Sequence, residues 1–242
     1  MIATLGMIVG ASVGGLHNAA LLADSTVAGI GPATTLFWVL IAATLVVAVA
    51  DWVAVALDRR PAEYVLKPLT MVVLIAAAVV ASPVVSGPAR GWMVAGLICS
   101  LAGDVFLMLE DRFVEGLASF LVGHVAYVVA LWQLGVDLPR FVVGLVLVAV
   151  MMATIGRSIV AGAKRTDARL GVPVAAYISV ISLMLASAIG TGIWVAILGA
   201  ALFYVSDAVI GISRFIKDFS FSRLLVMTTY HLGQIGLVLA LV

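Results

Sequence analysis

Six ionisable side chains lie inside apolar stretches of the sequence: Asp51, Lys67, Asp104, His124, Asp207 and His231. An Asp or Lys at the centre of a membrane helix costs about 2.5–3.5 kcal/mol on insertion scales, so each needs a reason to be there. Carboxyl and imidazole groups exchange protons, and a carboxyl group in an apolar environment keeps its proton more readily than in water. These residue types therefore indicate proton-transfer chemistry within a membrane.

Further polar residues follow these side chains at helical spacing. Residues three or four apart share one face of a helix. The pairs at this spacing are Ser100 with Asp104, His124 with Tyr127, Tyr204 with Asp207, and Tyr230 with Gln234. Four helices could therefore direct polar groups into one cavity.

The composition indicates that membrane-spanning helices carry these polar side chains. Of the 242 residues, 64% are hydrophobic and only 10% are charged, whereas a soluble domain has about 25% charged residues. Apolar runs long enough to cross a bilayer recur along the chain. We expect spans over 2–23, 34–57, 64–82, 91–109, 113–134, 139–161, 170–188, 191–213 and 220–241.

The fold class predicted is all-α, a polytopic transmembrane bundle of eight spans, or nine if the first run also crosses. That run is the weakest, because His17 and Asn18 interrupt it and no basic residue flanks it. We expect one membrane-embedded domain over 1–242, with 1–30 as an extra N-terminal helix and 34–242 as the bundle. Its oligomeric state is open, although Gly10 and Gly14 have the spacing of a helix-pairing motif.

The distribution of Lys and Arg predicts the orientation in the cell membrane. Eleven of the thirteen lie in or beside the links on one side of the predicted spans: Arg59, Arg60, Lys67, Arg112, Arg157, Lys164, Arg165, Arg169, Arg214, Lys217 and Arg223. The positive-inside rule makes that side cytoplasmic and places the C-terminus outside. The ionisable residues then fall in the cytoplasmic half of the membrane or near its midplane.

Several classes of function are disfavoured. A net charge of +1 gives no argument for binding nucleic acid, and the single cysteine, Cys99, excludes an intramolecular disulfide. The three histidines lie in distant segments without an HxxH or HxxxH pair, so a metal site is not expected. No Walker loop, GxSxG elbow or dinucleotide fingerprint occurs.

Short links predict which helices are neighbours. The links after the fourth and eighth predicted spans are short, so the helices they join should be antiparallel neighbours. That arrangement brings Asp104 toward His124 and Asp207 toward His231. A weak internal similarity of sequence points the same way: a glycine lies eight residues before both Asp104 and Asp207, and a histidine follows each in the next predicted span.

Structural explanations stay open for several of these residues. A lone carboxylate can fill a packing defect, and Lys67 can extend its ammonium to the interface. Asp51 is expected near the interface, paired with Arg59 or Lys67. His231 can serve as a hydrogen-bond partner between helices.

Five blocks in the sequence resemble the YhhN family of membrane lysoplasmalogenases. They are KPLTM (67–71), SLAGDVFLM (100–108), FLVGHVAY (120–127), GAALFYVSD (199–207) and TYHLGQ (229–234). The blocks occur in the family's order over about residues 60–240. The resemblance implies a bundle of eight spans, which makes 1–23 the additional element. The last block departs from the family pattern, since His231 stands where an apolar residue is more usual.

The resemblance implies hydrolysis of the vinyl ether bond of a lysoplasmalogen to a fatty aldehyde and a glycerophospho-alcohol. Such a reaction starts with proton transfer to the alkenyl β-carbon and continues with attack of water on an oxocarbenium-like cation. Two carboxyl groups in unlike environments can divide the acid and anionic roles, as in glycosidases. Asp104 is expected to be the acid and Asp207 the stabiliser or base, with His124 orienting one of them.

The remaining site residues have expected binding or supporting roles. Lys67 is expected to meet the lipid phosphate. Hydrogen bonds to the substrate are expected from Ser100, Tyr127, Tyr204, Tyr230 and Gln234. Supporting positions are expected for Asp51, Thr70 and His231. The reaction requires no metal or organic cofactor; the expected partners are a lysophospholipid and the surrounding membrane lipids.

Other functions are compatible with the same residues. Buried Asp and His pairs also form the proton relays of coupled transporters, although few mid-span Gly or Pro breaks occur here. A different intramembrane lipid hydrolase, acting on ester or amide lipids, is an alternative enzyme. A lipid-binding scaffold would leave the carboxyl groups unexplained.

Overall fold

The computed structural model describes residues 32–82, 87–109 and 111–242. These residues form helices and no strand. The elements are α2 (Pro32–Ala56), α3 (Arg60–Val80), α4 (Gly87–Met108), α5 (Phe113–Gln133), α6 (Leu138–Met151), η1 (Met152–Gly156), α7 (Arg157–Thr166), η2 (Ala168–Leu170), α8 (Gly171–Thr191), α9 (Trp194–Phe215) and α10 (Ser222–Leu239). The predicted span 2–23, with His17, Gly10 and Gly14, lies outside the described residues.

Local sequence explains where several helices begin and end. The Asp137 carboxylate accepts a hydrogen bond from the backbone N–H of Arg140 at 3.1 Å and so caps the start of α6. Gly192 ends α8 at φ +68°, in the left-handed region that favours glycine. The segment η1 is a π-helical turn that joins α6 to α7 without a break.

The helices form a transmembrane bundle, as predicted. Seven helical stretches among the described residues are long and apolar enough to cross a membrane, the one over Leu138–Thr166 including α6, η1 and α7. Large apolar side chains remain exposed on the outside of the bundle; Val143 on α6, for example, is 66% exposed. Such a surface is suited to lipid and not to water.

The eighth long helix, α10, is more polar because it lies inside the bundle. It packs against α2, α3, α4 and α9. Its polar side chains Thr229, Tyr230, His231 and Gln234 are all buried. Polar groups on this helix therefore face other helices and not lipid.

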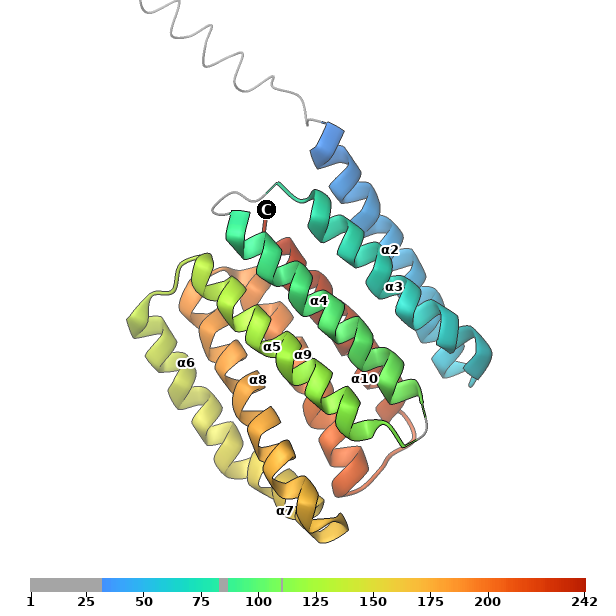
Figure 1. The fold of residues 1–242 in the computed structure, drawn as a ribbon, viewed down its shortest axis with the longest axis vertical. Coiled ribbons are helices and arrows are strands. Elements are labelled where there is room, and N and C mark those ends of the chain that lie inside the picture. Colours follow the sequence, from blue (N-terminus) through green and yellow to red (C-terminus); the bar gives the residue numbers. More distant parts are fainter. Residues whose placement is uncertain (1–31, 83–86, 110) are drawn as a thin grey trace, which may run out of the picture.

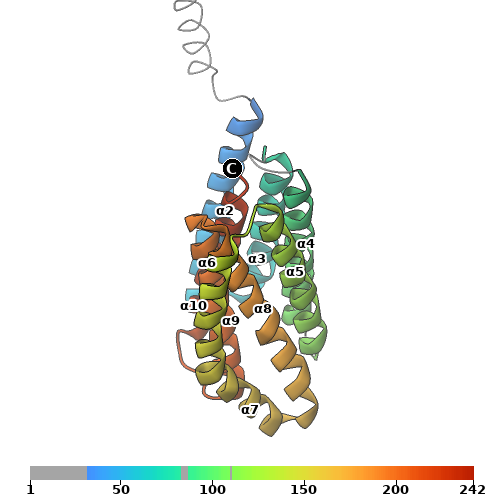
Figure 2. The ribbon, with the colours of Figure 1, turned by 90° about the vertical axis from the view of Figure 1, so that its left-hand side faces the viewer.

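Three helical hairpins and one outer pair build the bundle (Figure 1). The pairs α2–α3, α4–α5 and α9–α10 are in extensive contact, as are α6 and α8. This confirms α4 with α5 and α9 with α10 as neighbours, as their short links predict. The links α2–α3, α4–α5, α7–α8 and α9–α10 lie at one end, which we name the basic end, and the C-terminus lies at the other (Figures 1 and 2).

Glycines allow α9 and α10 to approach closely. A Cβ atom added to Gly199 would lie 2.7 Å from the backbone nitrogen of Leu237, and one added to Gly236 would lie 2.7 Å from the Cα of Gly199. These separations leave no room for a methyl group. The close contact fixes the depth of the polar residues of α10 relative to those of α9.

We predict that Gly199→Ala destabilises the bundle, because the new methyl group meets backbone that cannot rotate away. Overpacking of this kind costs about 1–3 kcal/mol. The measurement is thermal unfolding of the protein purified in detergent. Gly91→Ala is the matched control, since a Cβ there meets nothing within 4 Å. An equal unfolding temperature for the two variants would contradict the close contact.

Candidate active site

A buried ion pair joins α3 to α4. Lys67 Nζ lies 3.0 Å from Asp104 Oδ1, and the hydroxyl of Tyr230, on α10, donates a hydrogen bond to Asp104 Oδ2 at 2.7 Å. The side chains of Lys67 and Asp104 are only 9% and 1% exposed. Each oxygen of Asp104 thus has a donor, and the carboxylate is shared by three helices.

Hydrogen bonds between uncharged side chains lie beside this ion pair. The Tyr127 hydroxyl donates to Gln234 Oε1 at 2.6 Å and lies 3.2 Å from Ser100 Oγ. Ser100 therefore contacts Tyr127 instead of Asp104, although it is four residues from Asp104. The Thr70 hydroxyl bonds back to the carbonyl of Leu66 within its own helix.

The second predicted carboxyl group, Asp207, lies in a different setting. Tyr177, on α8, donates a hydrogen bond to Asp207 Oδ2 at 2.6 Å. His124 Nε2, on α5, lies 3.7 Å from the same oxygen. No Lys or Arg forms an ion pair with Asp207 among the described residues. Its two neighbours are a phenol and a buried imidazole.

Two aromatic rings separate these clusters. Phe120 lies 6.5 Å from the His124 ring and 5.9 Å from the Tyr230 ring, between centroids. Phe203 lies 4.8 Å and 5.3 Å from the same two rings. The clusters of Asp104 and Asp207 are therefore adjacent, but apolar side chains divide them.

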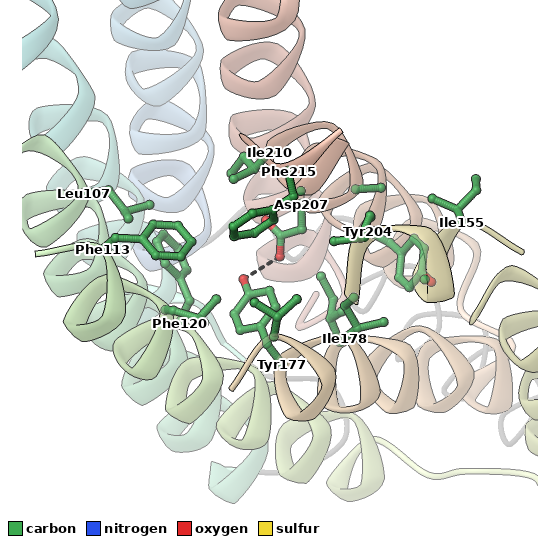
Figure 3. A pocket seen from close by; sticks show the side chains of 17 residues that line it. Leu107, Phe113, Phe120, Ile155, Tyr177, Ile178, Tyr204, Asp207, Ile210 and Phe215 are labelled. Atoms are coloured by element: carbon green, nitrogen blue, oxygen red, sulfur yellow. Dashed lines mark hydrogen bonds between the residues drawn. The ribbon is translucent and has the colours of Figure 1, made fainter. Parts of the chain in front are cut away.

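An apolar cleft leads to Asp207 (Figure 3). It encloses about 750 Å³ of atom-free space, including its open mouth. Its walls come from α4, α5, η1, α7, α8 and α9, and its few polar groups are those of Tyr177, Tyr204 and Asp207. Asp104 and Lys67 do not line it. The shape and lining suit a hydrocarbon chain with one reactive end.

A third polar cluster lies between α2 and α10. Trp52 Nε1 donates a hydrogen bond to His231 Nδ1 at 3.1 Å, and Asp51 Oδ2 lies 4.0 Å from the same nitrogen. Asp51 is fully buried. The expected pairing of Asp51 with Arg59 or Lys67 is wrong: its ion-pair neighbour is His231, and Lys67 pairs with Asp104.

An ion-pair network covers this cluster at the basic end. Arg223, on the first turn of α10, contacts Asp58 at 2.8 Å and also pairs with Glu63 of α3. The hydrogen bond from Arg223 holds the pKa of Asp58 below its usual value. The network ties the α2–α3 hairpin to α10.

Several predicted contacts differ in the structure. Asp104 contacts Lys67 and Tyr230 instead of His124, and His124 lies against Asp207. His231 contacts Trp52 instead of Asp207. Link length predicts which helices are neighbours but not how each helix is rotated about its axis, and rotation decides which side chains meet.

Lys67 also differs from its predicted surroundings. The ammonium group is buried inside the bundle and paired with the Asp104 carboxylate. Sequence reasoning missed Tyr177 altogether. Its only signal was a tyrosine early in an apolar span, at the seventh residue of α8. Among the described residues, no three His, Cys, Asp or Glu side chains form a group that could hold a metal ion.

Comparison with known proteins identifies the family. The family model of YhhN matches residues 62–241. This range contains every residue of the three polar clusters except Asp51 and Trp52. The chain belongs to the YhhN family.

Curated relatives of this YhhN protein have names that state an activity. A lysoplasmalogenase of Mycobacterium bovis is 36% identical over 154 residues, 61% of this chain and 58% of that protein. Lysoplasmalogenase TMEM86B of Rattus norvegicus is 32% identical over 161 residues, 65% of this chain and 64% of that protein. The human TMEM86B is 32% identical over 147 residues, 60% of each chain. The matches span about three fifths of the length of these relatives. No solved structure matches the chain.

We predict that Lys67→Met destabilises this YhhN protein, because the substitution leaves the Asp104 carboxylate buried without its cation. Breaking a buried ion pair in this way costs about 3–5 kcal/mol. Thermal unfolding in detergent measures the loss. Adding Asp104→Asn to Lys67→Met should recover part of it, since the remaining amide carries no charge. A wild-type unfolding temperature for Lys67→Met alone would contradict the ion pair.

Proposed function

We propose that this chain hydrolyses the vinyl ether bond of lysoplasmalogens, releasing a fatty aldehyde and a glycerophospho-alcohol. The observation that carries the proposal is the position of Asp207, a carboxyl group 10% exposed at the wall of an otherwise apolar cleft. The names of the curated relatives support the same reaction. An alkenyl chain can occupy the cleft with its ether end against the carboxyl group.

The reaction requires a proton on carbon before any bond breaks. Asp207 in its acid form gives its proton to the alkenyl β-carbon, and the C=C electron pair forms the new C–H bond. The α-carbon becomes an oxocarbenium-like cation next to the Asp207 carboxylate. Attraction between the two charges is strong in a site that excludes water.

Water completes the reaction. Its oxygen bonds to the α-carbon while its proton passes to the Asp207 carboxylate, which restores the acid form. The hemiacetal then collapses: its hydroxyl proton passes to the glyceryl oxygen, the C–O bond breaks and the aldehyde forms. One carboxyl group thus acts as acid and then as base, as in glycosidases. The hydrogen bond from Tyr177 holds this carboxyl group in place, and the His124 ring lies beside it.

The assignment of Asp104 as the acid is revised in this proposal. An ammonium at 3.0 Å and a phenol at 2.7 Å both donate to Asp104, and such partners favour a carboxylate without its proton. Asp207 lies in an apolar cleft and forms no ion pair with a Lys or Arg among the described residues, so it is better suited to hold a proton. Asp104 then contributes a negative charge fixed by Lys67, one aromatic layer away from the reacting cation.

We predict that Asp207→Asn lowers aldehyde release from lysoplasmalogen by at least about a hundredfold, because the amide cannot donate the proton. Asp104→Asn should lower it less, because the variant retains the proton donor. The assay measures fatty aldehyde released by detergent-purified protein, with and without a chelator. Asp137→Asn is the control, since an amide oxygen caps α6 equally well. Wild-type turnover by folded Asp207→Asn would overturn the proposal, and transport cannot produce an aldehyde.

We also infer the orientation in the cell membrane. Ten of the thirteen Lys and Arg residues lie in the links at the basic end or on the helices beside them, and an eleventh, Lys67, is buried in the bundle. The positive-inside rule favours this end in the cytoplasm. The cleft and the Asp207 cluster would then lie in the cytoplasmic half of the membrane.

A fusion experiment in a bacterial inner membrane tests this orientation. Alkaline phosphatase fused after Val242 should be active, because it folds only outside the cytoplasm, and a fluorescent protein fused after Lys217 should be bright. Replacing the basic residues of the α7–α8 link by Gln should weaken the preference. The opposite pattern, with an inactive C-terminal phosphatase, would reverse the orientation.

A further inference from the structure

An arginine is stacked on the wall of the cleft. The guanidinium carbon of Arg214 lies 3.7 Å from the centroid of the Phe113 ring. Phe113 and Phe215 are in edge contact, and both line the cleft together with Asp207 (Figure 3). Arg214 itself is exposed, on the last turn of α9. It therefore contacts the cleft wall from the last turn of α9, near the basic end.

This guanidinium is available for an anion. Some cations of the basic end are paired: Arg112 with Glu115, and Arg223 with Asp58 and Glu63. Others, such as Arg59 and Lys217, form no ion pair among the described residues, and what distinguishes Arg214 is its contact with Phe113 on the cleft wall. Arg214 forms no ion pair within residues 32–82, 87–109 and 111–242. The guanidinium lies over the Phe113 ring, and among the described residues no acceptor bonds to its N–H groups, so these can make the paired hydrogen bonds that a phosphate accepts. The contact with Phe113 restricts the side chain before any ligand binds, which reduces the entropy lost on binding.

The spacing of Arg214 and Asp207 along α9 suits a lysoplasmalogen. Arg214 is seven residues after Asp207, so the two lie on nearly the same face, about 10.5 Å apart along the axis. Side chains on a helix lean toward its N-terminus, which brings the guanidinium closer to Asp207 than this separation. In a lysoplasmalogen, the glyceryl unit joins the vinyl ether to the phosphodiester. A ligand with its ether at Asp207 would place its phosphate near Arg214.

We propose that Arg214 binds the phosphodiester of the lysophospholipid at the mouth of the cleft. The inference rests on the proposed function for the identity of the ether end. It assigns to Arg214 the role that the sequence suggested for Lys67, whose ammonium is paired with Asp104. Asp207 and Arg214 then hold the two ends of the glyceryl unit, and the tail lies along the apolar wall.

Two substrates with the same alkenyl chain test the assignment: 1-alkenyl-lysophosphatidylethanolamine and 1-alkenylglycerol, which lacks the phosphate. Arg214→Gln should raise KM for the first roughly tenfold or more, since hydrogen bonds to charged groups are among the strong ones. Its kcat should change little, and KM for 1-alkenylglycerol should stay as in the wild type. All measurements use full-length protein at one detergent concentration. An equal change for both substrates, or no change for either, would overturn the assignment.

Further variants separate stacking from charge. Phe113→Leu keeps the wall apolar but removes the ring under Arg214, so KM for the phosphate-bearing substrate should rise by a smaller factor. Arg214→Lys keeps the charge but loses the paired donors, and it should fall between Arg214→Gln and the wild type. Arg59→Gln removes the same charge from the exposed α2–α3 link, away from the cleft. If Arg59→Gln raised KM for the phosphate-bearing substrate as much as Arg214→Gln, the effect would come from net charge alone. That result would overturn the assignment.

Further measurements distinguish a failure of the proposed function from a failure of the Arg214 assignment. If wild-type protein releases no aldehyde from either substrate, the proposed function fails. Binding of lysophosphatidylethanolamine and of monoalkylglycerol then tests Arg214 alone. The inference is supported if Arg214→Gln binds the phosphate-bearing lipid more weakly than the wild type does but binds monoalkylglycerol equally well. It is overturned if the variant and the wild type bind both lipids equally well. Strong competition by inorganic phosphate, absent in Arg214→Gln, would assign the residue to free phosphate instead of a lipid.

Discussion

The ion pair between Lys67 and Asp104 organises the interior of this bundle. A charge inside hydrocarbon is tolerated only with a partner, and these two side chains come from different helices. Tyr230 adds a third helix to the same carboxylate, so α3, α4 and α10 have a common point of contact. The polar face of α10 follows from this arrangement, since its buried tyrosine, histidine and glutamine each lie beside a group on a neighbouring helix.

Once Asp104 has a cation, the two carboxyl groups are no longer equivalent. Among the described residues, Asp207 has Tyr177 and His124 as its polar contacts, and it lies on the wall of a mostly apolar cleft. Difference in surroundings is the means by which enzymes give two similar groups different tasks. In the proposed reaction, the apolar cleft holds the lipid tail, Asp207 at its wall donates the proton, and Arg214 beside Phe113 binds the phosphate. The bundle therefore carries the proposed reaction without any large polar cavity.

Much of this arrangement could be predicted from the sequence. Hydropathy and breaks predicted the helices closely; the run 113–134, for example, is α5, Phe113–Gln133. The energetic penalty of buried charge pointed to Asp104, Asp207 and His124. The partners could not be predicted, because they depend on helix rotation, which periodicity along one apolar helix does not fix. For the same reason Tyr177 was missed, and Arg214, in a basic link, looked like any other residue of the positive side.

The central claim is that Asp207, and not Asp104, holds the proton that the reaction consumes. Infrared spectroscopy of the purified protein at neutral pH measures it directly, through the carbonyl absorption of protonated carboxyl groups. Spectra of the wild type, Asp207→Asn and Asp104→Asn would be compared, with Asp51 present in all three. We predict that the absorption decreases in Asp207→Asn and is retained in Asp104→Asn. A decrease in Asp104→Asn, with no change in Asp207→Asn, would contradict the account.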